Sequence, residues 1–173
     1  MRKHLLLAIV AMSGLFLGAV AQAQTPPPAP APIPDAIPFD IPYGMPIALE
    51  RAKRAAEAAV AEAKKRNWKM AIAIVNPSGD LVYFEKMDDT QLASIDISQA
   101  KAKSAAIFRR PSKAFFDVIE SGHPYVMTLK GMVGSEGGIP LIESGKVIGA
   151  IGVSGGTGAQ DGVVAKAGAD TVK

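Results

Sequence analysis

Hydrophobic and polar residues alternate with a helical period near the start of the folded part of this chain. Between residues 46 and 66, alanine, valine and isoleucine recur three or four positions apart, and lysine, arginine and glutamate fill the positions between them. This pattern predicts an amphipathic helix. Because its apolar stripe is mostly alanine, we expect the helix to lie very close to the surface that supports it.

Two further stretches predict helices in the middle of the chain. Residues 95–108 are rich in alanine, which favours a helix, and Ser94 and Asp96 are residues of the type that caps one. Pro111 ends this helix, because proline lacks the amide hydrogen that a helix interior needs. Residues 112–120 then predict a short helix with an aromatic apolar side.

Short runs of branched and aromatic residues predict two β-hairpins, each around a turn sequence. The paired runs are residues 69–75 with 81–86, and residues 139–142 with 147–153. A final helix follows the second hairpin, with Thr157 or Ser154 as its cap. Since pairs of strands stand between helices, and the strict alternation that a parallel sheet needs is absent, we expect an α+β domain with an antiparallel sheet.

The N-terminal 45 residues differ in composition from this domain. A basic start, an apolar run of 16 residues from Leu5 to Val20 and small residues up to Ala23 predict a secretory signal peptide over residues 1–23. An uncleaved anchor is the less favoured alternative, because a spanning helix needs about 20 residues. We therefore expect a periplasmic or secreted protein that has no membrane association after cleavage.

Nine of the 13 prolines fall between residues 24 and 46. Proline fixes φ and removes a donor, so this segment favours extended polyproline II. We expect a linker or arm over residues 24–45, with an apolar second half that can dock on a surface, and one domain over residues 46–173.

Composition excludes several classes of site and partner. The chain has no cysteine, so neither a disulfide nor a thiolate site is possible. Removing Arg2 and Lys3 with the signal peptide takes the formal charge from +3 to +1. We see no basic stripe with interleaved aromatic residues and expect no nucleic-acid partner. The acidic residues at 85, 88 and 89 match no calcium loop, and we predict no metal site.

The segment from Val147 to Asp161 contains two patterns associated with chemistry. Residues 152–156 fit G-x-S-x-G, but the hydrolase fold places an acid and then a histidine after the serine, and no histidine follows Ser154. A dinucleotide loop is also disfavoured, because the third glycine and a second strand are missing. The remaining alternatives are an anion-binding loop at a helix N-terminus and glycines that permit a tight turn. The anion-loop hypothesis names Ser154, Gly155, Gly156 and Asp161.

Three blocks of this sequence together resemble a known family. They are "IVNPSGDLVYFEKMDD", "SIDISQAKAKSAA" and "GGIPLIESGKVIGAIGVSGGTGAQDGVVAKAGA", and they are similar to the GlcG/HbpS-like haem-binding family, also called the haem-degrading family. The resemblance covers residues 45–173. It implies an α+β domain with profilin-like layering, in which a sheet of about five antiparallel strands is flanked by helices. It also implies a homo-oligomer, and in some members haem binding, whereas other members accompany glycolate or diol metabolism.

If haem is the ligand, one irregular segment offers most of the donors. Axial ligands of haem iron are usually histidine, methionine, cysteine or tyrosine, and residues 121–132 contain a histidine, a tyrosine and two methionines. Arg109 is a candidate for pairing with a propionate, although a basic helix end, which the helix dipole favours, is the preferred explanation. The candidate haem ligands are His123, Tyr125, Met127 and Met132.

Two classes of function remain open at this point. The first is an exported, oligomeric protein that binds haem or a small ligand, in haem handling or redox sensing. The second is an enzyme or accessory protein of low activity on a small hydroxy or carbonyl metabolite, with Lys101 and Asp96 lining a polar pocket near Ser154 and Asp161. A third hypothesis is a purely structural or interaction module, in which the proline-rich arm contacts a partner.

Overall fold

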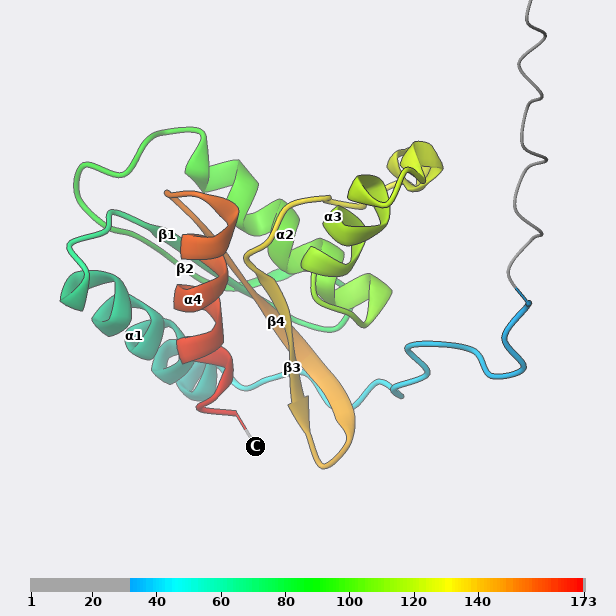
Figure 1. The fold of residues 1–173 in the computed structure, drawn as a ribbon. Coiled ribbons are helices and arrows are strands. Elements are labelled where there is room, and N and C mark those ends of the chain that lie inside the picture. The colour runs from blue at the N-terminus through cyan, green and yellow to red at the C-terminus, as the bar shows by residue number, and fades with distance from the viewer. Residues whose placement is uncertain (1–31, 173) are drawn as a thin grey trace, which may run out of the picture. The chain divides into compact units, whose positions relative to one another are not determined.

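The computed structural model describes residues 32–172, and its compact unit begins at Ala36. Four strands and four α-helices, with one short 3-10 helix, make up the fold (Figure 1). In chain order they are α1 (Leu49–Lys65), β1 (Ala71–Val75), β2 (Leu81–Lys86), α2 (Ser94–Phe108), α3 (Lys113–Glu120), η1 (Pro124–Thr128), β3 (Gly138–Glu143), β4 (Lys146–Ser154) and α4 (Gly158–Ala169). The predicted signal peptide, residues 1–23, and the first part of the arm lie outside the described residues.

The strands form one antiparallel sheet in the order β2-β1-β4-β3. This confirms the α+β class and both predicted hairpins; the sheet has four strands where we expected about five. A short piece of the arm lies beside β4, where Tyr43 forms a parallel bridge to Val147. The amide of Val147 donates to the carbonyl of Pro42, and the amide of Gly44 donates to the carbonyl of Val147, both at 2.8 Å.

The two faces of the sheet carry side chains of different size. Large residues such as Ile72 and Ile151 pack against α1 and α4, whereas Ala73 and Ala150 pack against α2. Five alanines on one side of α1 are buried, as the alanine stripe predicted: Ala52, Ala55, Ala56, Ala59 and Ala63. Gly152 lies against α2 so closely that a Cβ there would overlap the carbonyl oxygen of Ser98. Small residues therefore bring α2 almost into backbone contact with the sheet.

The caps of two helices show where local sequence decides structure and where it does not. Thr157 caps α4 as predicted, in a capping box with Gln160. The predicted caps of α2 were wrong, because the N-cap is Ala93 and its side chain makes no capping bond. Ser94 instead lies inside the helix, where its buried hydroxyl accepts a hydrogen bond from Ser154.

No helix within residues 32–172 is both long enough and apolar enough to cross a bilayer.

Candidate functional site

The corner between β4 and α4 contains the G-x-S-x-G pattern, and its serine is not available for chemistry. Ser154 is buried, and its hydroxyl donates to the hydroxyl of Ser94 at 3.1 Å. His123 lies elsewhere, with its ring against Ser121 and Tyr125. The structure therefore does not bring the serine and the histidine together as a nucleophile and its base would require.

The glycine loop at this corner already holds an anion, which is a side chain of the protein itself. The amide of Gly156 donates to Oδ1 of Asp161 at 3.0 Å, and Oδ2 of Asp161 lies 2.6 Å from Nζ of Lys101. Gly137 leaves room for this pair, because a Cβ there would crowd both Asp161 and Lys101. The loop thus binds a carboxylate as an anion site would, but the carboxylate comes from α4.

Lys101 and Asp161 form an ion pair in the protein interior, with Lys101 only 2% exposed. Burial removes the Asp161 carboxylate from water and raises its pKa, although the bonds from Lys101 and Gly156 act in the opposite direction. The pair joins α2 to α4 across the end of the sheet. This geometry suits a structural link, because Lys101 and Asp161 bond to each other and the second oxygen of Asp161 accepts from Gly156.

The segment after α3 has the opposite character, because most of its donor side chains face outward. Tyr125 is 66% exposed and Met127 is 64% exposed, and His123 is exposed as well. The rings of His123 and Tyr125 meet edge to face, with centroids 6.2 Å apart. Figure 1 shows α3 and η1 projecting beyond the end of α2, away from α1. Met132 lies further along this segment and is half-buried.

A hydrogen-bond chain favours one tautomer of the neutral His123 ring. The hydroxyl of Ser121 donates to the carbonyl of Val118 at 2.8 Å and lies 3.1 Å from Nδ1 of His123. A hydroxyl has one proton to donate, so the bond from Ser121 to Val118 favours the tautomer in which Nδ1–H donates to Ser121 and the lone pair of the ring lies on Nε2. The backbone amide of His123 also donates to Val118, which ties the histidine to α3.

Arg109, the predicted partner of a haem propionate, contacts the proline-rich arm instead. Its guanidinium donates to the carbonyl of Ile41 at 3.1 Å and lies 3.5 Å from the Asp40 carboxylate. It also lies over the ring of Tyr43. The structure therefore places Arg109 with the arm, while the other four candidate haem ligands follow α3.

Two of the hollows on the described surface were not predicted from the sequence. The first has a volume of about 300 Å³ and lies between α3 and the start of α4; it is lined by Phe116, Gly134, Ser135, Glu136, Gly158 and Ala159. Its residues come from three separate parts of the chain, so no local pattern marks it. The residue that could have indicated this hollow is Phe116, an aromatic side chain that stays exposed on a short helix.

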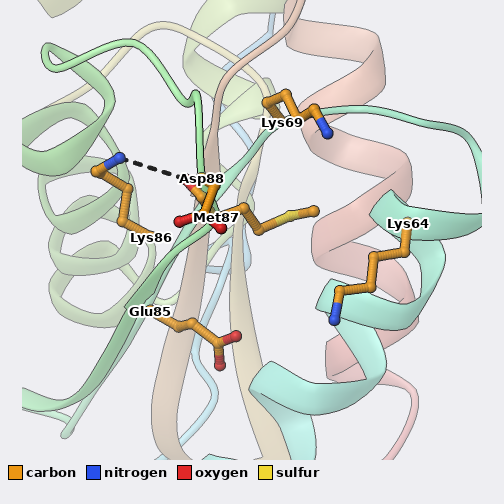
Figure 2. A pocket seen from close by; sticks show the side chains of 6 residues that line it. All are labelled: Lys64, Lys69, Glu85, Lys86, Met87 and Asp88. Atoms are coloured by element: carbon orange, nitrogen blue, oxygen red, sulfur yellow. Dashed lines mark hydrogen bonds between the residues drawn. The ribbon is translucent and has the colours of Figure 1, made fainter.

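The second hollow, of about 330 Å³, lies between the end of α1 and the end of β2 (Figure 2). Its lining is Lys64, Lys69, Glu85, Lys86, Met87 and Asp88. Figure 2 shows the Met87 side chain reaching between Lys64 and Lys69. Lys86 turns to the other side and donates to the carbonyl of Met87 at 3.2 Å. Within residues 32–172, no group of three or more metal-ligating side chains is gathered at one place.

Comparisons with known proteins agree with the fold. A family model described as haem degrading protein HbpS-like matches residues 47–170. Protein GlcG of Escherichia coli strain K12 is 39% identical over 93 residues, which are 54% of this chain and 69% of that protein. An uncharacterized 15.0 kDa protein from the dhaT-dhaS intergenic region of Citrobacter freundii is 37% identical over 123 residues, 69% of this chain and 87% of that protein.

Two solved structures have the same fold. A double mutant of Streptomyces reticuli HbpS superposes with a TM-score of 0.69 at 27% identity, over 84% of this chain and 99% of that one. A PduOC:heme complex superposes with a TM-score of 0.68 at 25% identity, over 75% of this chain and 96% of that one.

Proposed function

Since this chain belongs to the HbpS-like family, as the three sequence blocks predicted, we propose that its domain binds haem, with His123 as a ligand of the iron. A structural neighbour that is a complex with haem supports this proposal. The observation that carries it is the hydrogen-bond chain through Ser121, which presents Nε2 of an exposed imidazole as a lone-pair donor. A ligating histidine usually donates its other ring N–H to a neighbouring group in this way.

The surroundings of His123 fit a large, flat, apolar ligand. Tyr125, Met127 and Leu129 expose apolar surface on the same short segment, and Phe116 of α3 exposes an aromatic ring at the first hollow. The thioether of Met127 and the phenol of Tyr125 are further groups of the kind that bind haem iron. Bound haem would supply a redox-active iron, while these side chains would orient the ring and exclude water from one face.

A homo-oligomer and export belong to the same proposal. The hollow beside Phe116 is too small to enclose a haem, so we infer that a second copy of the chain covers the exposed apolar surface of α3 and η1. The predicted signal peptide supports a periplasmic or secreted location. Native mass measurement of the mature protein, with and without haem, tests the assembly.

A haem titration of the mature chain tests the binding site. We expect a shifted Soret band in the wild type and its loss in His123→Ala. Ser121→Ala should weaken binding about tenfold, because outer-shell partners of metal ligands contribute on that scale. Lys130→Ala is the matched control, since Lys130 is an exposed neighbour without a role in this bond chain. An unshifted Soret band in the wild type, or a shift that persists in His123→Ala, would contradict the proposal.

The second hollow favours one alternative, a small polar metabolite as ligand or substrate. Lys101, Ser154 and Asp161 are buried and bonded within the protein, whereas Lys64 and Glu85 border an open hollow with walls of opposite charge (Figure 2). Such walls suit a small hydroxy or carbonyl acid. Turnover or binding of glycolate that is lost in Lys64→Met and Glu85→Gln, but kept in His123→Ala, would favour this second function.

A further inference from the structure

The proline-rich arm is bonded to the C-terminal end of α2. The hydroxyl of Tyr43 donates to the carbonyl of Ile107 at 2.9 Å and lies 3.3 Å from that of Ala106. These carbonyls belong to the last turn of α2, where a helix runs out of amides of its own; that of Ala106 also accepts from the backbone amide of Arg109 at 3.3 Å. The arm therefore completes the hydrogen bonding of a helix that precedes α3 by only a few residues.

An arginine connects the arm to α3. The guanidinium carbon of Arg110 lies 3.9 Å from the ring centroid of Phe39, in the arm, and 5.1 Å from that of Phe115, in α3. A guanidinium over an aromatic face is held by the ring quadrupole. Arg110 also donates to the carbonyl of Phe108 at 3.1 Å. This hydrogen bond is a third contact that holds the guanidinium between the two rings.

Backbone conformation at this contact is unfavourable for the residues that occupy it. Phe39 has φ of 63° and Arg109 has φ of 55°, a region that residues other than glycine, asparagine and aspartate rarely adopt. Such conformations persist only when surrounding contacts hold them. Here the contacts are the Phe39–Arg110 stack and the bonds of Arg109 to Ile41 and Asp40.

Three other contacts help to hold α3 in place, and one of them is the packing of the half-buried Ile119 on Gly134. Phe115 is its one buried residue, and the ring of Phe108 meets that of Phe115 edge to face at 5.0 Å. At the start of the helix, the Ser112 hydroxyl donates to the carbonyl of Ser135 and accepts from the amide of Gly138. Since His123 is tied to α3 through Val118, the position of α3 also sets the position of the proposed haem ligand.

We propose that residues 39–43 act through Arg110 as a latch that positions α3 and η1, and that Phe39 and Arg110 are therefore positioning residues for ligand binding. The part of this inference that concerns haem rests on the proposed function. With the latch closed, the ring of Phe115 is held from both sides and His123 has one orientation. With the latch open, α3 keeps its Ser112 anchor, its contact with Phe108 and the packing of Ile119 on Gly134.

Amide hydrogen exchange and haem titration of the full mature chain test the latch. In Phe39→Ala we expect the amides of α3 to exchange roughly two- to fivefold faster, and haem to bind weaker by a similar factor, the scale of one cation–π contact. Exchange in β1 and β4 should not change. Phe39→Tyr should restore both values, because it keeps the aromatic face. Ile37→Ala is the matched control, since Ile37 is an arm residue that is 77% exposed.

Arg110→Lys is the second variant, because it keeps the charge but loses the flat guanidinium, and it should reproduce Phe39→Ala. Unchanged exchange of α3 in both variants would overturn the latch. So would unchanged haem affinity in both, if His123→Ala still abolishes binding. If the wild type binds no haem at all, the proposed function fails, and the exchange of α3 still decides whether the arm positions that helix.

Discussion

Polar groups at the β4–α4 corner bond to one another, whereas those of the α3–η1 segment face outward. At the corner, Asp161 binds Lys101 and the amide of Gly156 within the interior. In the projecting segment, His123 is held at Nδ1 by Ser121 and keeps Nε2 free. The corner has the more conspicuous sequence pattern, but the segment has the accessible chemistry. A motif indicates a site only where its groups are left open to a ligand.

The largest effect should come from breaking the buried pair at the corner. Lys101→Met leaves the Asp161 carboxylate buried without its cation, and we expect the free energy of unfolding to fall by about 3–5 kcal/mol. Urea denaturation measures it. Lys166→Met is the matched control, because Lys166 pairs with Asp170 at 2.7 Å on the exposed side of α4, and it should cost less than about 1 kcal/mol. Equal losses in the two variants would show that Asp161 does not need Lys101.

A methyl group added at the corner should have the next largest effect. In Gly152→Ala the new Cβ would overlap backbone atoms of Ser98 and Ala102, so we expect a loss of about 1–3 kcal/mol from overpacking. Gly158→Ala controls for the substitution itself, because its Cβ would meet Glu136 at an ordinary 3.4 Å. Thermal unfolding of both variants checks this, and a stable Gly152→Ala would mean that α2 can move away from the sheet.

The pH dependence of stability should carry a signature of Asp161. Its pKa is raised by burial above the ordinary 3.8, so the folded state holds the proton at a pH where the unfolded state has lost it. The free energy of unfolding therefore falls as pH rises above 3.8, by at most about 1.4 kcal/mol per pH unit. Asp161→Asn lacks this contribution. Urea denaturation of both proteins at successive pH values measures the difference, and parallel curves would contradict the raised pKa.

The smallest effect on stability should come from the segment that we propose as the ligand site. His123 is exposed, so His123→Ala should change the free energy of unfolding by no more than about 0.5 kcal/mol while it abolishes the haem Soret shift. Val126→Ala in the same 3-10 helix is the contrasting variant, because Val126 is buried and its loss removes packed methyl groups. Loss of stability in His123→Ala would make the histidine a structural residue.

Much of the fold was predictable because its signals are local. The alanine stripe before residue 66, the hairpin turns and Thr157 each specify their own element through spacing, turn chemistry or capping. The prediction that Ser94 caps α2 was wrong because the contact that decides its place is not local. A serine before a helix is favoured as a cap, but here the contact with Ser154, 60 residues away, decides its place.

The candidate site was predictable only as a list of donors. Sequence alone indicated His123, Tyr125, Met127 and Met132 as one segment with haem-binding side chains. It could not show that Ser121 holds Nδ1, or that Phe116 borders a hollow against α4. The first depends on how the chain turns at the end of α3, and the second on how it returns after η1; the residue pattern encodes neither.

By itself, the sequence determined the α+β class, the position of most elements, the family and the absence of any thiolate chemistry, because spacing and composition act over a few residues. Only the tertiary structure decided which polar groups satisfy each other. Lys101 and Asp161 are 60 residues apart, and Phe39 and Arg110 are 71 apart, by their residue numbers. Whether such groups are buried as partners or remain open to a ligand depends on contacts between distant segments, and those form only when the chain packs.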